Sequence, residues 1–345
     1  MTAVALISIP RNAVKAAGTG AWFAIIIVTV LFIFGIFIIA SLSKMFEGKT
    51  IYEYSNLLVG RFMTKIIGFI YTTYFCFFSI LLFRIISDFI KANSLPLTPI
   101  WAILLMFIGV ILYIVYKGIT TIGRLLEIYG FIFIVVSLAT HTAEFFLGDA
   151  NYIKPFFEPK LVKEYIFGAK DLISAFIGIE ILTIIPFGKV NNKRGVLYSV
   201  LGVLYVGLFY IFATETSVMI VGINDILYYN ASLVEAIRET KLPSVFFLER
   251  SDILFLTVGT IGILSGLATI LFAATENIVK LFSITKRNIV IVAVGILVFI
   301  SCMFLNESRQ VIYLFENVLP IIGILTGFII PIILFIIAKV KKYES

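Results

Sequence analysis

Long apolar runs alternate with short polar connections along the whole chain. An apolar helix of about 17 residues or more is long enough to cross roughly 30 Å of hydrocarbon. The pattern predicts nine full membrane spans, over residues 21–42, 66–90, 99–116, 125–146, 172–187, 195–221, 253–275, 289–305 and 318–338. The apolar run at 1–9 is too short to span alone. The segment SLVEAIRE at 232–239 predicts an amphipathic turn inside a long connection.

One predicted span, 172–187, contains a glycine, a carboxylate and a proline in close succession, in the sequence SAFIGIEILTIIPFG at 174–188. A membrane helix keeps its backbone groups paired internally, and an intramembrane acid is costly and functional by default. Gly178, Glu180 and Pro186 therefore predict a helix that is interrupted where a ligand binds, as in many transporters. The alternative is a kinked helix in which Glu180 pairs with a neighbour for packing.

The composition supports a polytopic membrane protein, because 61% of the residues are hydrophobic and 14% are charged, against about 25% charged in soluble domains. We expect one integral membrane domain over residues 1–345, with a first repeat at about 1–150 and a second at 151–345. The basic residues lie in short loops beside spans, so the net charge of +7 indicates membrane orientation and no nucleic-acid partner. A single histidine, two cysteines inside spans and no phosphate-loop motif predict no metal, no cofactor and no enzyme activity.

Other polar residues inside spans have simpler interpretations. Arg84 and Asp88 are four residues apart on one helix face and are expected to pair. Glu127, His141 and Glu144 lie near the ends of the 125–146 span, where side chains can reach the membrane interface. Three tyrosines could either line a cavity or pack in the core: Tyr71, Tyr74 and Tyr205.

Lysine and arginine are distributed unevenly between the two sides of the predicted spans. The short segments on one side carry only four basic residues, namely Arg11, Lys15, Lys91 and Arg309. Because short cytoplasmic loops collect basic residues, the richer side is expected to be cytoplasmic, with the C-terminus inside. The fifteen basic residues on that side are Lys44, Lys49, Arg61, Lys65, Lys117, Arg124, Lys189, Lys193, Arg194, Lys280, Lys286, Arg287, Lys339, Lys341 and Lys342.

The short run at 1–9 fits this orientation as the outer half of a first helix. Ten helices would then form two sets of five in opposite orientation, and helix 1 would correspond to helix 6. Locally, VALISIPRN at 4–12 resembles EILTIIPFG at 180–188, since each apolar run ends at a proline. We therefore predict an all-α membrane protein with a ten-helix inverted-repeat (5+5) transporter-like fold, with broken helices 1 and 6 and a first helix truncated in its N-terminal half.

Three segments carry a family resemblance: ISIPRNAVKAAGTGAW at 7–22, FIGIEILTIIPF at 176–187 and FLERSDILFL at 247–256. In order and spacing they resemble the spore germination permeases, the B subunits of GerA-type nutrient receptors, within the amino acid, polyamine and organocation transporter superfamily. The resemblance covers essentially the whole chain. It implies residence in the spore inner membrane, and partnership with an A-type membrane subunit and a C-type lipoprotein.

Two features depart from the family pattern. Family members begin with a cytoplasmic segment and a full first helix, whereas this chain begins at or after the centre of that helix. Gly20 and Ala21 precede Trp22 where an acidic residue is expected before the alanine. We expect either a start codon assigned late or an impaired copy.

The expected function is a nutrient-sensing receptor subunit that binds a small germinant, an amino acid by expectation, at the broken sixth helix. Freed backbone groups would take the ammonium and carboxylate ends of the ligand, while Glu180 supplies negative charge or orders the unwound turn. The alternatives are a proton- or sodium-coupled amino acid transporter of the same fold and a nonfunctional truncated copy. The candidate ligand-binding residues are Ser174, Gly178, Ile179, Glu180, Thr183 and Pro186 in the sixth helix, and Ser8 and Pro10 in the first.

Overall fold

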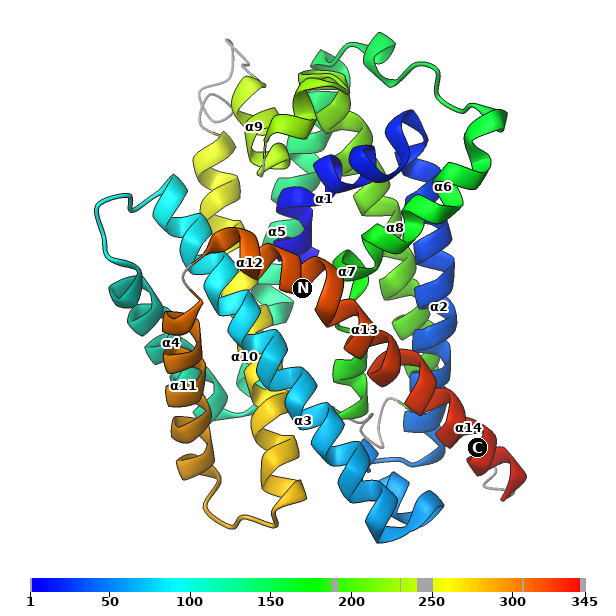
Figure 1. Ribbon diagram of the computed structural model, residues 1–345, viewed down its shortest axis with the longest axis vertical. Helices are drawn as coiled ribbons and strands as arrows, with labels where there is room; N and C mark the ends of the chain where they lie inside the picture. The colour runs from blue at the N-terminus through cyan, green and yellow to red at the C-terminus, as the bar shows by residue number, and fades with distance from the viewer. Residues whose placement is uncertain are drawn as a thin grey trace. The chain divides into compact units, whose positions relative to one another are not determined.

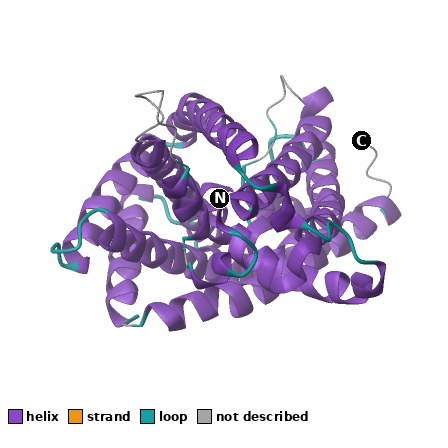
Figure 2. Cartoon of the chain, turned by 90° about the horizontal axis from the view of Figure 1, so that it is seen from above, coloured by secondary structure: helices purple, strands orange, loops and turns teal. Residues whose placement is uncertain are grey.

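The computed structural model describes residues 2–185, 187, 192–229, 231–240, 251–305 and 307–341, which form helices and their connections (Figure 1). No strand occurs in these ranges (Figure 2). Helices satisfy every backbone group within their own segment, as hydrocarbon requires. The predicted all-α class is therefore confirmed.

Eight helices of the described chain are long and apolar enough to cross a membrane: Ala5–Met45, Ile51–Asn93, Ile100–Lys117, Ile119–Leu147, Arg194–Val221, Thr257–Leu281, Arg287–Phe304 and Ser308–Val340. They account for eight of the nine predicted spans. The ninth, at 172–187, is not a long helix but a set of short helical pieces. The chain is an integral membrane protein.

Large apolar side chains cover the outside of these helices. Phe62, Phe69 and Phe131 are each more than 60% exposed, and so are Met106 and Ile321. Water would penalise such a surface, at about 25 cal/mol per Å² of apolar area. In a bilayer the same side chains face lipid tails without that cost.

Helix α3 (Ile51–Asn93) begins well before the apolar run that predicted it. Its first turn is a capping box, in which the Glu53 Oε2 atom accepts the Thr50 backbone N–H at 2.8 Å and the Thr50 hydroxyl at 3.0 Å. Gly60, with φ of 80°, then redirects the chain into the apolar part of the helix. Polar capping residues therefore start this helix, which an apolar-run criterion does not detect.

The chain packs as two compact units, which are described separately. The first comprises Met1–Ile33, Leu125–Phe176 and Leu201–Ile263. In it α1 packs against α6, α7, α9 and the 3-10 segments η4 (Ala169–Leu172) and η6 (Asp225–Tyr228). Its helices, some of them shared with the second unit, are α1 (Thr2–Ala17), α2 (Ala21–Met45), α5 (Ile119–Leu147), α6 (Val162–Gly168), α7 (Ile173–Phe176), α8 (Asn192–Val221), α9 (Ser232–Glu239) and α10 (Ser251–Leu281).

Pro10 ends the first apolar run but does not end the first helix, which continues to Ala17. Proline lacks an N–H and clashes with the preceding turn, so helix interiors normally exclude it. Here hydrogen bonds with two other helical segments hold the turn that follows Pro10. The Arg11 backbone N–H donates to Ser232 Oγ at 3.1 Å, and Arg11 Nε donates to the Leu227 carbonyl at 3.0 Å. Contacts with α9 and η6 therefore stabilise α1 beyond its proline.

The amphipathic turn predicted at 232–239 is confirmed as α9. Leu233, Val234 and Ile237 are buried, whereas Arg238 and Glu239 are exposed. An apolar stripe of this spacing binds a short helix against a core. Through Ser232 this same helix holds the turn after Pro10.

The second unit comprises Phe34–Arg124, Ile177–Val200 and Leu264–Ser345. Helices α3, α4 (Ile100–Lys117) and α11 (Arg287–Phe304) pack side by side in it (Figure 1). The predicted pair is confirmed, with Arg84 Nε 3.1 Å from an Asp88 oxygen. Arg84 Nη1 also donates to the Cys302 carbonyl, and the Ser308 hydroxyl donates to Asp88. This pair therefore ties α3 to α11 and to α12 (Ser308–Tyr313).

The last membrane segment is helical throughout but contains two π-helical turns, η7 (Leu314–Val318) and η8 (Leu325–Ile329), between α12, α13 (Leu319–Ile324) and α14 (Ile330–Val340). A proline follows each turn by two residues, at 320 and 331. The Ile330 N–H donates to the Leu325 carbonyl, five residues back. The next amide in this pattern belongs to Pro331 and has no proton, so the Thr326 carbonyl is left for another donor. That donor is the Tyr71 hydroxyl of α3.

Candidate functional site

The backbone changes direction at Gly178, inside the segment that sequence predicted to be interrupted. The helical segments α6, η4 and α7 run from Val162 to Phe176 and are followed by a turn at Ile177 and Gly178. Gly178 has φ of 127°, a backbone conformation that residues with a Cβ atom rarely adopt. A short 3-10 segment, η5 (Ile179–Thr183), follows the turn. Glycine is therefore the residue that permits this break.

Glu180 caps the backbone at the break. Its carboxylate is completely buried, and Oε2 accepts the Gly178 backbone N–H at 2.7 Å. The Thr183 hydroxyl donates to the Glu180 carbonyl at 2.6 Å, which ties the two ends of η5 together. The other carboxylate oxygen, Oε1, has no hydrogen-bond partner among the described residues. One oxygen therefore orders the turn, and the second keeps its capacity to accept a hydrogen bond.

Residues of α3 and η8 surround this carboxylate within the second unit. The Tyr74 hydroxyl lies beside Glu180 but is without a hydrogen bond of normal geometry in the described structure. A Cβ atom added at Gly327 would lie 2.7 Å from Glu180 Oε1, so the glycine allows η8 to approach the acid. Tyr71 is fully buried beside Tyr74 and bonds the Thr326 carbonyl. The π-helical turn and the break at Gly178 therefore meet around Glu180.

The other predicted site residues have different surroundings. Ser174 is buried on α7, in the first unit. Ser8 is half-buried and Pro10 is buried, both on α1, and α1 packs against α7. Ile179 is half-buried in η5, next to Glu180. Pro186 lies outside the described residues.

Sequence reasoning did not single out Thr326 and Gly327. The signal was present, because TGFIIP at 326–331 places a glycine four residues before a proline inside an apolar run. The same criterion had identified the sixth helix, where acid, glycine and proline occur together. For Tyr71 and Tyr74 the sequence leaves two interpretations open, the lining of a cavity and packing in the core. Tyr205 is more than one-third exposed and stacks on Phe209.

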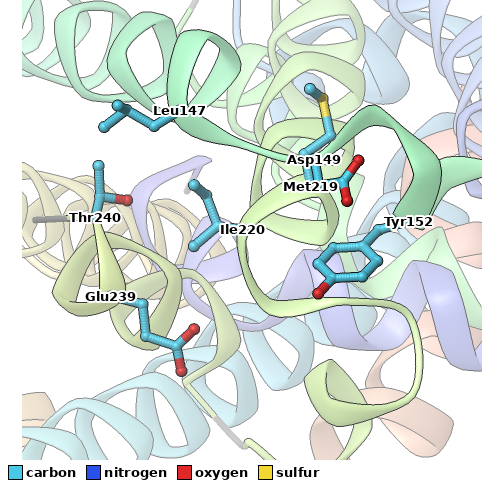
Figure 3. Close-up of a pocket in the computed structure, with 7 residues that line it drawn as sticks. All are labelled: Leu147, Asp149, Tyr152, Met219, Ile220, Glu239 and Thr240. Carbon is cyan, nitrogen blue, oxygen red and sulfur yellow. The ribbon is translucent and has the colours of Figure 1, made fainter.

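A cavity of about 350 Å³ lies in the first unit, and none of the predicted site residues lines it (Figure 3). The Asp149 carboxylate in its wall accepts the Asn151 backbone N–H and side-chain amide, both at 2.9 Å. Partial burial, followed by repulsion from Glu235 and Asp225, raises the pKa of Glu239. The lining is Leu147, Asp149, Tyr152, Met219, Ile220, Glu239 and Thr240.

The geometry defines the class of protein: a polytopic helical membrane protein with a buried acid that caps a break in a membrane segment. A family model described as "Spore germination protein", of the spore permease family, matches residues 1–311. The chain belongs to this family. The resemblance read from its three sequence segments is thereby confirmed.

Several relatives come from Bacillus subtilis strain 168. Spore germination protein YndE is 23% identical over 346 residues, which cover 99% of this chain and 93% of the relative. Spore germination protein A2 is 26% identical over 351 residues, with the same two coverages. Spore germination protein B2 is 25% identical over 262 residues, covering 72% of this chain and 67% of the relative. The chain is a germination-related membrane protein.

Proposed function

We propose that this chain is the nutrient-sensing subunit of a spore germinant receptor, and that it binds a small germinant bearing an ammonium group at the break around Gly178. One observation carries the proposal. Glu180 caps the broken backbone with one carboxylate oxygen and leaves the other buried and unpartnered among the described residues. An unsatisfied buried acceptor costs about 1–3 kcal/mol or more, and a ligand that donates to it removes that cost.

The chemistry of the site favours a positively charged donor. A buried carboxylate without a basic partner in the described structure carries an uncompensated charge, unless it holds a proton or meets a cation. The ammonium group of an amino acid supplies both charge and hydrogen-bond donors. The Tyr74 hydroxyl beside Glu180 can accept a second hydrogen bond from the same group. We therefore place the ammonium end of an amino acid between Glu180 and Tyr74.

The receptor role rests on the family and on relatives named spore germination proteins A2 and B2. We propose that the chain resides in the spore inner membrane and assembles with an A-type membrane subunit and a C-type lipoprotein. We also propose the ten-helix inverted repeat, with breaks in helices 1 and 6. The break at Gly178 supports the broken sixth helix of this arrangement.

The test is the Glu180→Gln substitution in spores that lack their own nutrient receptors and express this chain with its partner subunits. Glutamine keeps an oxygen that can accept the Gly178 N–H, so the cap survives and only the charge is lost. We expect near-normal protein abundance in the membrane and loss of germination in response to a panel of amino acids. Normal germination of Glu180→Gln spores would refute the proposed function.

Two further variants separate binding from folding. Glu127→Gln removes an exposed carboxylate from α5 and should leave abundance and germination unchanged. Glu180→Ala removes the cap as well as the charge, which leaves the Gly178 N–H without its acceptor. We expect lower abundance for this variant, because a buried unsatisfied group lowers the stability of the fold by roughly 1–3 kcal/mol.

A further inference from the structure

A second buried acid lies in the first unit and plays no part in the proposed site. His141 and Glu144 on α5 are both completely buried, and His141 Nδ1 lies 2.7 Å from Glu144 Oε2. The Thr216 hydroxyl of α8 donates to the same oxygen at 2.8 Å. From sequence these side chains were expected to reach the membrane interface. That expectation is wrong, because their spacing of three residues turns both toward α8.

The hydrogen bonds indicate where the protons lie. The Thr216 hydroxyl is 2.8 Å from Glu144 Oε2 and 3.3 Å from His141 Nδ1. From the shorter contact we assign Oε2 as the acceptor of both the Thr216 hydroxyl and the Nδ1 proton of His141. His141 Nε2 and Glu144 Oε1 are buried and have no partner in the described part of the chain. Phe209 and Phe212 of α8 meet the imidazole edge-on, with ring centroids 5.7 and 6.1 Å away. The pair is thus enclosed by apolar rings and retains two unused polar atoms.

Charge balance then requires one more proton. A neutral imidazole beside a carboxylate would leave a single negative charge in a membrane interior, which is strongly unfavourable. One further proton removes this charge, either on His141 Nε2 or on Glu144 Oε1, the two atoms without a partner among the described residues. We assign it to Nε2, because imidazole is a stronger base than a carboxylate, which gives an imidazolium–carboxylate pair with no net charge. No bond other than the one to this proton forms or breaks, and the proton comes from solvent.

The charged groups near this pair have other partners or lie apart from it. Glu215, next to Thr216 on α8, accepts the Trp22 backbone N–H at the start of α2. Glu127, on the same helix as His141, is exposed and lies fourteen residues away, about 21 Å along the helix axis. Phe255 of α10 meets Phe133 of α5, with ring centroids 5.9 Å apart. No lysine or arginine pairs with Glu144 among the described residues.

The cavity of Figure 3 lies beyond the end of α5 that carries the pair, and neither His141 nor Glu144 lines it. The Gly148 N–H donates to the Glu144 carbonyl at 2.8 Å, so the cavity wall at Leu147 and Asp149 begins one helical turn beyond Glu144. A Cβ at Gly148 would come within 2.5 Å of Met219 Cβ, so the glycine allows α5 and α8 to close above the pair. Asp149 and Glu239 in the cavity wall present acidic groups to solvent protons.

We propose that His141, Glu144 and Thr216 form a proton-binding site between α5 and α8, loaded from the cavity at the end of these two helices. The site is separate from Glu180 in sequence and in packing unit. It gives the protein one buried proton that exchanges with solvent from the cavity side. Loss of the site would leave the proposed nutrient site intact, so the two proposals can fail independently.

His141 is the only histidine in the chain, so histidine labelled with ¹⁵N gives a single imidazole spin system in NMR. The full chain should be purified in lipid nanodiscs through a tag without histidine. We expect both ring nitrogens to carry a proton, as the imidazolium–carboxylate pair requires. A neutral ring at neutral pH in the wild-type protein would overturn the proposal.

Substitutions identify the cause of the protonation. In Glu144→Gln the carboxylate charge is absent, and the ring should become neutral at neutral pH. In Thr216→Val the carboxylate remains, and the ring should stay doubly protonated. A ring that stays doubly protonated in Glu144→Gln would show that Glu144 does not hold the proton. If Glu144→Gln does not accumulate, the wild-type spectrum alone still decides whether the imidazolium exists.

Access through the cavity is tested by rate. Leu147→Trp fills the cavity next to Glu144 and should slow the response of the imidazole signal after a pH jump. It should leave the spectrum at equilibrium unchanged. An unaltered rate in this variant would show that the proton does not enter through the cavity.

Discussion

At the scale of single residues, the two oxygens of Glu180 have different environments. Oε2 accepts the Gly178 N–H, Oε1 faces Gly327, and the Tyr74 hydroxyl lies beside the carboxylate. Both ideas raised by the sequence, a fixed charge and an ordered turn, can therefore apply to the same carboxylate. The ordering role is visible as a hydrogen bond. The charge role remains a proposal that substitution of Glu180 tests.

Gly327 offers a test that leaves Glu180 in place. Its added methyl group in Gly327→Ala would lie 2.7 Å from Glu180 Oε1 and 3.2 Å from Glu180 Cγ, so the carboxylate must shift. We expect germination to weaken at least tenfold in nutrient sensitivity, equivalent to about 1.4 kcal/mol. Membrane abundance should fall only modestly, because overpacking of this size typically costs about 1–3 kcal/mol.

Gly323→Ala is the matched control on the same segment. A Cβ there lies 3.4 Å from Ile177 Cδ1, an ordinary contact distance. Its germination response should equal that of the wild type. Equal nutrient sensitivity in Gly327→Ala and Gly323→Ala spores would show that the packing of Gly327 against Glu180 does not matter for germination.

At the scale of elements, the apolar pattern predicted most membrane helices because hydrocarbon selects for long uncharged runs. It failed where polar or special residues decide the boundary. The capping box at Thr50 starts α3 before the apolar run, and the hydrogen bond from the Arg11 N–H to Ser232 stabilises α1 after Pro10. The π-helical turns were invisible to a count of apolar residues. Yet prolines at 320 and 331 could have indicated irregular hydrogen bonding there.

The candidate site was predictable to the same degree. Gly178 and Glu180 stood out because an acid is rare in a membrane span, and here a glycine and a proline accompany it. The partners of Glu180 come from α3 and η8, far away in sequence, and only tertiary packing brings them together. His141 and Glu144 were assigned to the interface because their place near a span end was weighed above their shared helix face.

At the scale of the whole molecule, the distribution of basic residues predicts which side of each helix faces the cytoplasm. Tyr228 in η6 is 84% exposed and belongs to the side expected outside, whereas the exposed Thr285 belongs to the cytoplasmic side. In a background without Cys76 and Cys302, we expect Tyr228→Cys to react with a membrane-impermeant maleimide in intact cells. Thr285→Cys should react only after the membrane is opened. Labelling of Thr285→Cys in intact cells would show that the orientation is opposite to the predicted one.

The central claim is that Glu180 receives the ammonium group of the ligand. Its most direct test is the thermal unfolding midpoint of the purified full chain, with each natural amino acid and with analogues that lack the amino group. A ligand that binds the folded state raises this midpoint. We predict that at least one amino acid raises it in the wild type and in Glu127→Gln, that the matching analogue does not, and that Glu180→Gln abolishes the rise. An undiminished rise in Glu180→Gln, an equal rise with the analogue, or no rise with any amino acid in the wild type would contradict the account.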